Sequence, residues 1–277
     1  MPMPQDNPRT VFFVSDRTGI TAEALGRSLM SQFDGAAFRQ VTLPFIADID
    51  KANDAVARIN AAAASDGAQP LVFSTLVDDT LRDIIQRSHA LYLDFFATFI
   101  GPLESELGMK SSHAAGRAHA SADNAAYIQR IEAVNFALAN DDGVSTRFYS
   151  KADVILAGVS RSGKTPTCLY LALQYGVFAA NYPLTEDDLK RGRLPEALLP
   201  YCSKLFGLTI DPQRLQQIRH HRRPDSNYSS SDQVRYEVRK AEDIFRAAGV
   251  PCMNTTLPSI EEIATTILHQ TGIKRRF

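Results

Sequence analysis

One segment of this 277-residue chain has the residue types and spacing of a phosphate-binding loop. Its pattern is G-x-x-x-x-G-K-[ST], in which glycines let the backbone curl until successive N–H groups point at one anion. An apolar strand is expected to lead into the loop and a helix to leave it, and the helix N-terminus adds partial positive charge. This context disfavours a ligand-free turn. The candidate binding residues are Gly158, Val159, Ser160, Arg161, Ser162, Gly163, Lys164 and Thr165.

Two of these side chains have chemistry that a transferred phosphoryl group requires. Lys164 is the candidate catalytic cation, because it would neutralise the terminal phosphates. Thr165 is the candidate metal ligand, since its hydroxyl would bind Mg²⁺. Pro166 would occupy the first helical turn, where a missing N–H costs nothing.

The absence of certain motifs counts against several classes of phosphate-loop protein. The sequence has no N-K-x-D guanine-reading motif, and no apolar strand ends in Asp-Glu as in motor-like ATPases. It also lacks the H-R-D and D-F-G motifs of eukaryotic-type protein kinases. A fold like that of the small P-loop kinases remains.

A second acidic candidate lies beyond the loop. Residues 204–211 read as a strand that ends in Asp211, which is predicted to contact Mg²⁺ through water or to act as a catalytic base. The alternative is an N-cap ahead of Pro212. Asp187 and Asp188 are further candidates for the base.

A basic run follows Asp211 and suggests a lid. Arginine binds phosphate bidentately, so a helix dense in Arg could close on a phosphorylated ligand. A solvated helix face is the alternative. The residues concerned are Arg214, Arg219, His220, His221, Arg222 and Arg223.

The elements that must position these residues follow an alternating pattern. Strands are expected at 10–14, 38–45 and 71–76, with helices at 22–33 and 50–64 and a long helix opening at Asp79 or Thr80. Strand alternating with helix indicates an α/β fold with a doubly wound parallel sheet. The predicted organisation is an N-terminal α/β portion at 1–148, for regulation or substrate recognition, and a P-loop kinase-like catalytic domain at 149–277.

Three other segments carry weaker signals. Residues 15–23 could form a second anion or protein-substrate site, or simply a helix start capped by Thr21. Residues 101–124 are expected to be irregular after Gly101-Pro102, and His113 and His119 there lack a third ligand for a metal. Residues 250–262 read as a strand and a helix capped by Ser259 or Thr256, a junction that lies beside adenine in small P-loop kinases.

Composition sets the remaining limits. Net charge is −1, with −6 in residues 1–150 and +5 in residues 151–277, so an anionic ligand is expected in the second half and nucleic acid is not. No apolar run approaches the length of a membrane span, and the start does not resemble a secretory signal. Three widely spaced cysteines fit reduced thiols. We therefore expect a cytoplasmic protein without a membrane partner, with a homodimer as one option.

The chain resembles the phosphoenolpyruvate synthase and pyruvate, phosphate dikinase regulatory proteins. The resemblance spans nearly the whole sequence, and the combination is far more specific than a lone phosphate loop. It rests on residues 158–172 and on segments at 15–23, 43–45, 70–73, 141–143, 180–183, 205–212 and 260–265, with an Arg275-Arg276 ending.

This resemblance implies a bifunctional serine/threonine kinase and phosphorylase. Members phosphorylate a threonine of the target dikinase, inactivating it with ADP as donor. They also remove that phosphate with inorganic phosphate, releasing pyrophosphate. The implied cofactors are ADP, Mg²⁺ and inorganic phosphate, and the implied partner is phosphoenolpyruvate synthase. Pyruvate, phosphate dikinase as target, a small-molecule kinase and a nucleotide-dependent switch are the alternatives.

Overall fold

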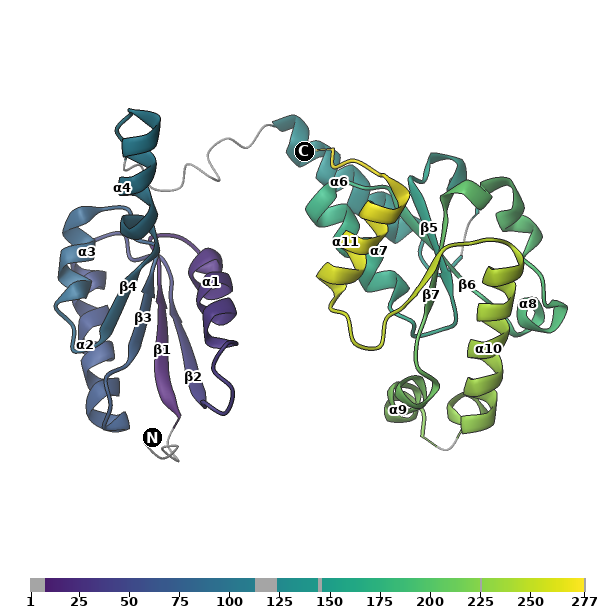
Figure 1. The fold of residues 1–277 in the computed structure, drawn as a ribbon, viewed down its shortest axis with the longest axis horizontal. Coiled ribbons are helices and arrows are strands. Elements are labelled where there is room, and N and C mark those ends of the chain that lie inside the picture. The colour runs from purple at the N-terminus through teal and green to yellow at the C-terminus, as the bar shows by residue number, and fades with distance from the viewer. Residues whose placement is uncertain (1–7, 113–123, 144–145, 225, 277) are drawn as a thin grey trace. The chain divides into compact units, whose positions relative to one another are not determined.

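The computed structural model describes residues 8–112, 124–143, 146–224 and 226–276. The chain divides into two compact units, residues 1–121 and 122–277, and each is described by itself. Each contains a four-stranded parallel sheet with helices on both faces (Figure 1). The predicted α/β, doubly wound parallel-sheet class is confirmed.

The first unit has the strand order β2-β1-β3-β4. Its strands are β1 (Arg9–Val14), β2 (Phe38–Leu43), β3 (Leu71–Ser74) and β4 (Leu91–Asp94), and its helices are α1 (Ile20–Met30), α2 (Ile49–Asp66), α3 (Asp79–Gln86) and α4 (Phe95–Leu107).

Both faces of that sheet are buried because side chains alternate along each strand. Phe12 and Val14 pack in the cluster that includes α2 and α3, whereas Val11 and Phe13 pack in the cluster that includes α1. Helix α1 begins after Gly19, whose φ is 82°, and has no side-chain cap. The alternative of Thr21 as N-cap is therefore wrong.

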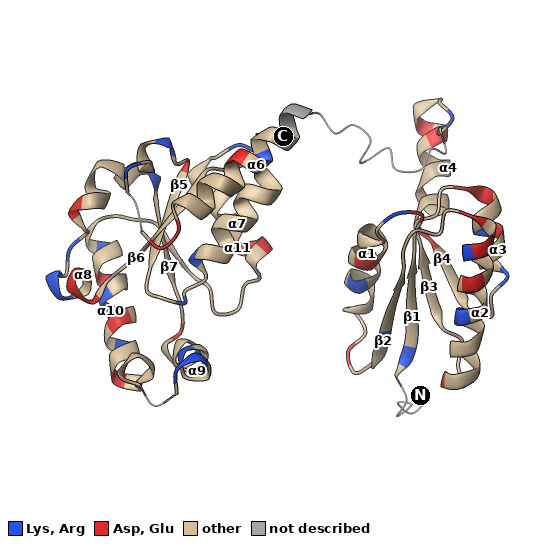
Figure 2. Cartoon of the chain, turned by 180° about the vertical axis from the view of Figure 1, so that it is seen from behind, with Lys and Arg blue, Asp and Glu red and all other residues tan. Residues whose placement is uncertain are grey.

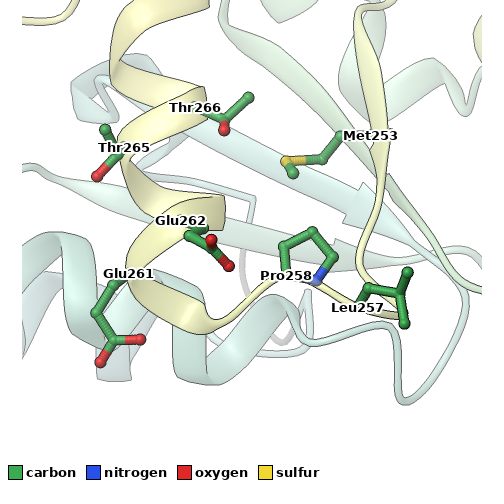
Figure 3. Close-up of a pocket in the computed structure, with 7 residues that line it drawn as sticks. All are labelled: Met253, Leu257, Pro258, Glu261, Glu262, Thr265 and Thr266. Atoms are coloured by element: carbon green, nitrogen blue, oxygen red, sulfur yellow. The ribbon is translucent and has the colours of Figure 1, made fainter. Parts of the chain in front are cut away.

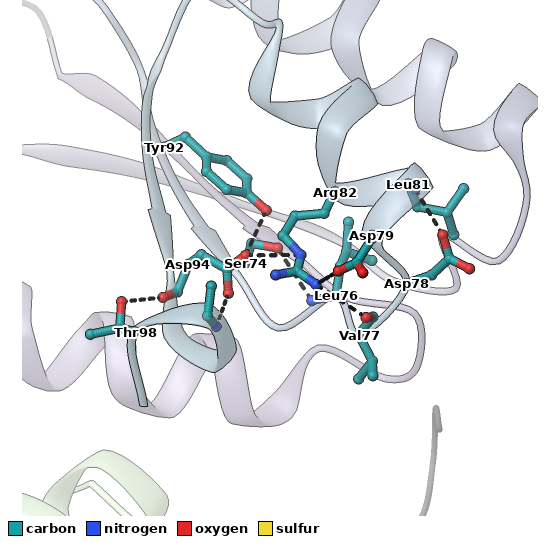
Figure 4. A network of polar contacts seen from close by, with 11 residues as sticks. Ser74, Leu76, Val77, Asp78, Asp79, Leu81, Arg82, Tyr92, Asp94 and Thr98 are labelled. Atoms are coloured by element: carbon teal, nitrogen blue, oxygen red, sulfur yellow. Dashed lines mark hydrogen bonds and ion pairs between the residues drawn. The ribbon is translucent and has the colours of Figure 1, made fainter. Parts of the chain in front are cut away.

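Polar groups at the carboxyl ends of β3 and β4 satisfy one another (Figure 4). Asp94 caps α4 by accepting from the Ala97 amide at 2.8 Å, and Arg82 forms an ion pair with its carboxylate at 3.4 Å. The hydroxyl of Tyr92 donates to the same carboxylate, and burial raises the pKa of that phenol. Helix α4 continues to Leu107 with Pro102 inside it, so the irregular stretch begins later than predicted. His113 and His119 lie outside the described residues.

The second unit has the order β6-β5-β7-β8, so its strands follow the same second-first-third-fourth pattern as the first unit. The strands are β5 (Val154–Gly158), β6 (Ala179–Pro183), β7 (Leu205–Thr209) and β8 (Cys252–Asn254). The helices are α6 (Asn124–Ala139), α7 (Lys164–Tyr175), α8 (Glu186–Arg191), α9 (Pro212–Arg222), α10 (Ser231–Ala247) and α11 (Ile260–Thr271), with short 3-10 turns at Tyr149–Lys151, Glu196–Lys204 and Asn227–Ser229.

Helix α6 belongs to the second unit, although the sequence analysis placed residues 1–148 together. Ala133 and Ala137 are buried in the cluster that contains Leu171 of α7, and Phe136 stacks on Phe178 with 5.0 Å between ring centroids. The apolar spacing of this segment predicts a buried face at Ile128, Ile131, Val134 and Leu138, but Ile128, Ile131 and Leu138 are 48%, 40% and 57% exposed, so that prediction is wrong. The helix is buried through its small alanines instead, which the spacing of large apolar residues does not reveal.

In the described part of the chain, no helix combines the length and the apolar character needed to cross a membrane.

Candidate functional site

The phosphate-loop motif lies at the carboxyl end of β5, between the strand and α7, as predicted. Gly158 is required there because a Cβ atom would lie 2.3 Å from the carbonyl oxygen of Leu208 in β7. Gly163 has a φ of 89° and forms the N-cap of α7 without a side-chain cap. Arg161 has a φ of 75°, a conformation that costs a non-glycine residue free energy.

Alternating left-handed residues in the loop expose its amides for an anion. Among the described residues, no acceptor bonds the backbone N–H of Ser160, Arg161, Gly163, Lys164 or Thr165, whereas the Ser162 amide donates to the Val159 carbonyl at 3.3 Å. Free donors at the start of a twelve-residue helix are the arrangement by which helix N-termini bind phosphate, as predicted for this loop.

Lys164 is the buried cation of the loop. It is only 4% exposed, and its Nζ donates to the Val159 carbonyl at 2.9 Å. Burial lowers the pKa of Lys164 to about 8, an effect that the nearby carboxylates of Asp142 and Asp141 partly oppose. A bound phosphate would favour the charged ammonium.

We expect anion binding to weaken as pH rises above about 8, because free Lys164 then loses the proton that the bound state needs. Binding of ADP or inorganic phosphate should take up protons at pH values above about 8. Calorimetry in two buffers of different ionisation enthalpy measures this uptake. Lys164→Met keeps the volume of the side chain and should remove the uptake, and equal uptake by both chains would contradict the assignment.

An acidic turn faces the start of α7. The Thr165 hydroxyl donates to Asp141 Oδ1 at 2.8 Å, and the Asn181 side-chain amide donates to the same oxygen. Asn181 in turn accepts from the Asp142 amide at 3.0 Å. The turn therefore holds the Asp141 carboxylate against the hydroxyl of Thr165, the predicted metal ligand.

The Asp142 carboxylate, unlike that of Asp141, is accessible from solvent. Asp142 is exposed, has a φ of 51°, and its carboxylate makes no hydrogen bond within the described residues. Among the carboxylates it exerts the largest attraction on the Lys164 ammonium. The sequence analysis quoted this Asp-Asp-Gly segment only for the family resemblance, because its contacts with Thr165 and Asn181 span 24 and 40 residues.

The acids predicted from sequence have structural partners. Asp211 caps α9, since its Oδ1 accepts from the amides of Gln213 and Arg214 at 2.9 and 3.0 Å. Asp188 completes the capping box of α8 with Thr185, and Asp187 lies in the first turn of that helix. Asp211 stays a predicted catalytic residue at the same sheet edge, where its amide donates to Thr256 Oγ1 at 2.7 Å.

The basic run forms most of α9, in which the blue segments of Figure 2 are arginines. Arg214 and Arg222 are exposed, but Arg219 is fully buried and bonded to protein groups. Arg219 therefore does not reach a ligand as a lid residue would.

An open hollow borders the loop that follows β8 (Figure 3). Thr255 ties this loop to the phosphate loop, because its Oγ1 donates to the Ser162 carbonyl at 3.1 Å. Leu257 is 92% exposed beside the hollow, and Ser259 caps α11 in a capping box with Glu262, as predicted. The lining residues are Met253, Leu257, Pro258, Glu261, Glu262, Thr265 and Thr266.

The predicted metal ligand, the Thr165 hydroxyl, lies against one carboxylate oxygen of Asp141. Within the described ranges, no group of three His, Cys, Asp or Glu side chains is arranged to hold a metal ion by itself. Mg²⁺ typically takes one or two carboxylates and completes its shell with water and substrate phosphates. The two oxygens, 2.8 Å apart, fit that mode of binding.

Comparison with known proteins agrees with the resemblance. Residues 11–268 match the family model described as Kinase/pyrophosphorylase. A relative from Burkholderia cenocepacia is 57% identical over 267 residues, covering 96% of this chain and 98% of the relative. Relatives from Alkalilimnicola ehrlichii and Pseudomonas putida are 56% and 54% identical over 268 and 269 residues, covering 97% of this chain each and 97% and 99% of the relatives. All three carry the name "Putative phosphoenolpyruvate synthase regulatory protein".

Proposed function

This chain belongs to the kinase/pyrophosphorylase family, and from that premise we propose that it reversibly phosphorylates phosphoenolpyruvate synthase. With ADP as donor, a threonine oxygen of the synthase would attack the β-phosphorus, and AMP would leave. In reverse, inorganic phosphate would attack the phosphothreonine phosphorus, and pyrophosphate and threonine would be released. The observation that carries the proposal is the set of free loop amides around a buried Lys164.

One anion cage would serve both directions. The loop amides and Lys164 would hold the β-phosphate of ADP in one reaction and inorganic phosphate in the other. Transfer through a loose transition state needs mainly positioning and charge neutralisation, which this cage supplies. The exposed hollow beside Leu257 would receive the nucleobase of ADP, which inorganic phosphate lacks.

Asp141 and Asp142 would have separate roles in metal binding and proton transfer. Thr165 and Asp141 would hold Mg²⁺, which supplies charge neutralisation on the phosphates when bound. Asp142 would accept the proton of the threonine hydroxyl and return it in the reverse reaction, because its carboxylate is exposed and unbonded. Asp211 is the rival base predicted from sequence.

Label transfer tests the function. The purified chain is incubated with [β-³²P]ADP, Mg²⁺ and phosphoenolpyruvate synthase phosphorylated on its catalytic histidine. We expect label on a synthase threonine, and loss of that label as pyrophosphate when inorganic phosphate is added. ADP binding without label on the synthase would contradict the proposal and favour a nucleotide-dependent switch. The same assay with pyruvate, phosphate dikinase distinguishes the two targets.

A further inference from the structure

We propose that Arg219 and Tyr228 are positioning residues that hold the phosphate loop in its anion-binding shape. Neither residue is assigned to ligand contact. Their role in phosphate binding rests on the proposed function, whereas their hold on the loop rests on contacts within the second unit. Three elements take part: the loop itself, the end of α9, and the turn between α9 and α10.

Arg219 connects these elements through its guanidinium. Nη2 donates to the Ser160 carbonyl at 3.1 Å and to Glu237 Oε2 at 2.7 Å, and Nη1 donates to the Tyr228 carbonyl at 3.1 Å. The guanidinium also lies 4.2 Å from the centre of the Tyr228 ring. Arg219 is fully buried, so moving its guanidinium away from these partners would leave a buried charge without compensating hydrogen bonds. Its position is therefore fixed.

Fixing the Ser160 carbonyl also fixes the next amide. The carbonyl of Ser160 and the N–H of Arg161 belong to one planar peptide unit and point in opposite directions. The Arg219 bond on one side therefore sets the direction of an N–H on the other side. That N–H has no acceptor among the described residues and is one of the free donors of the loop.

The strained conformation of Arg161 indicates that the loop needs such support. A non-glycine residue at a φ of 75° costs on the order of 1–3 kcal/mol and persists only where its surroundings enforce it. The bond from Arg219 acts on the peptide unit directly before this residue. The arginine thus holds the loop at its strained point.

Tyr228 makes a second, separate contact with the same loop residue. Its hydroxyl and the Ser160 hydroxyl share a hydrogen bond of 3.0 Å. Ser160 is therefore held by its carbonyl from Arg219 at the end of α9, and by its side chain from Tyr228 in the turn that follows. Tyr228 is only partly buried, so its hydroxyl can be removed with little effect on the core.

The test uses the full chain with Tyr228→Phe, which keeps the ring under Arg219 and removes the hydroxyl. Hydrogen exchange of the Ser162 amide, which donates to the Val159 carbonyl within the loop, is measured without ligand, and dissociation constants are measured for ADP and for inorganic phosphate. We expect faster exchange in the loop and a loss of roughly three- to tenfold in affinity for both anions, the size expected for one hydrogen bond. Thermal stability should match that of Tyr236→Phe, a change on α10 at a residue that is 37% exposed.

A second variant, Arg219→Lys, keeps a charge opposite Glu237 but loses the fork that reaches Ser160 and Tyr228. It should accelerate loop exchange more than Tyr228→Phe does. If Tyr228→Phe equals Tyr236→Phe in loop exchange or in anion affinity, the inference is overturned. If the unmodified chain binds neither ADP nor phosphate, the proposed function fails, and loop exchange alone then decides whether these residues hold the loop.

Discussion

Lys164→Ala is expected to abolish ADP-dependent phosphorylation and phosphate-dependent dephosphorylation together, each by at least roughly 10²–10³-fold. Lys164 is the buried cation of the loop, at 4% exposed, and a charge interaction is strongest where water is excluded. Both rates are measured with labelled ADP and with phosphothreonine-bearing synthase.

The fold should survive this substitution. Burial depresses the pKa of Lys164 to about 8, so the charged ammonium is disfavoured by its surroundings and its loss relieves that cost. Lys190→Ala is the matched control, because the Lys190 side chain is 61% exposed and forms an ion pair with Glu186 on the surface of α8. Loss of one activity with the other spared would show that the two reactions do not share one anion cage.

Asp142→Asn is expected to slow transfer in both directions by roughly 10²–10⁴-fold, the usual contribution of a positioned general base. Asparagine matches the shape of aspartate and tolerates the φ of 51°, so the turn should be preserved. Affinity for ADP should be retained or slightly improved, because a negative charge leaves the neighbourhood of an anion. Single-turnover rates and calorimetry separate the two effects.

Asp211→Asn serves as the rival variant in the same assay. Asparagine caps helices as well as aspartate does, so α9 should remain intact. We expect a smaller loss of rate than for Asp142→Asn. A large loss for Asp211→Asn with near-normal transfer by Asp142→Asn would assign the base to Asp211, as the sequence alone predicted.

Local sequence patterns predicted several elements of this fold correctly. The loop between β5 and α7, the parallel α/β class and the Ser259 cap of α11 follow from spacing, β-branched runs and capping residues that act within a few positions. Arg219 shows the limit of such patterns. It lies in a run of basic residues that suggests solvent or phosphate, yet its side chain is fully buried.

The sequence by itself determined the family, the position of the phosphate loop and the residues Lys164 and Thr165 within it, because a glycine-rich anion cradle is built from consecutive amides. Only the tertiary structure decided which acids face that cradle, which unit α6 joins and what Arg219 holds. Asp141 meets Thr165 from 24 positions away, Asn181 meets Asp141 from 40, and Arg219 reaches Ser160 across 59. Contacts of that range depend on how strands order themselves in a sheet and how helices pack over it, which local periodicity does not specify.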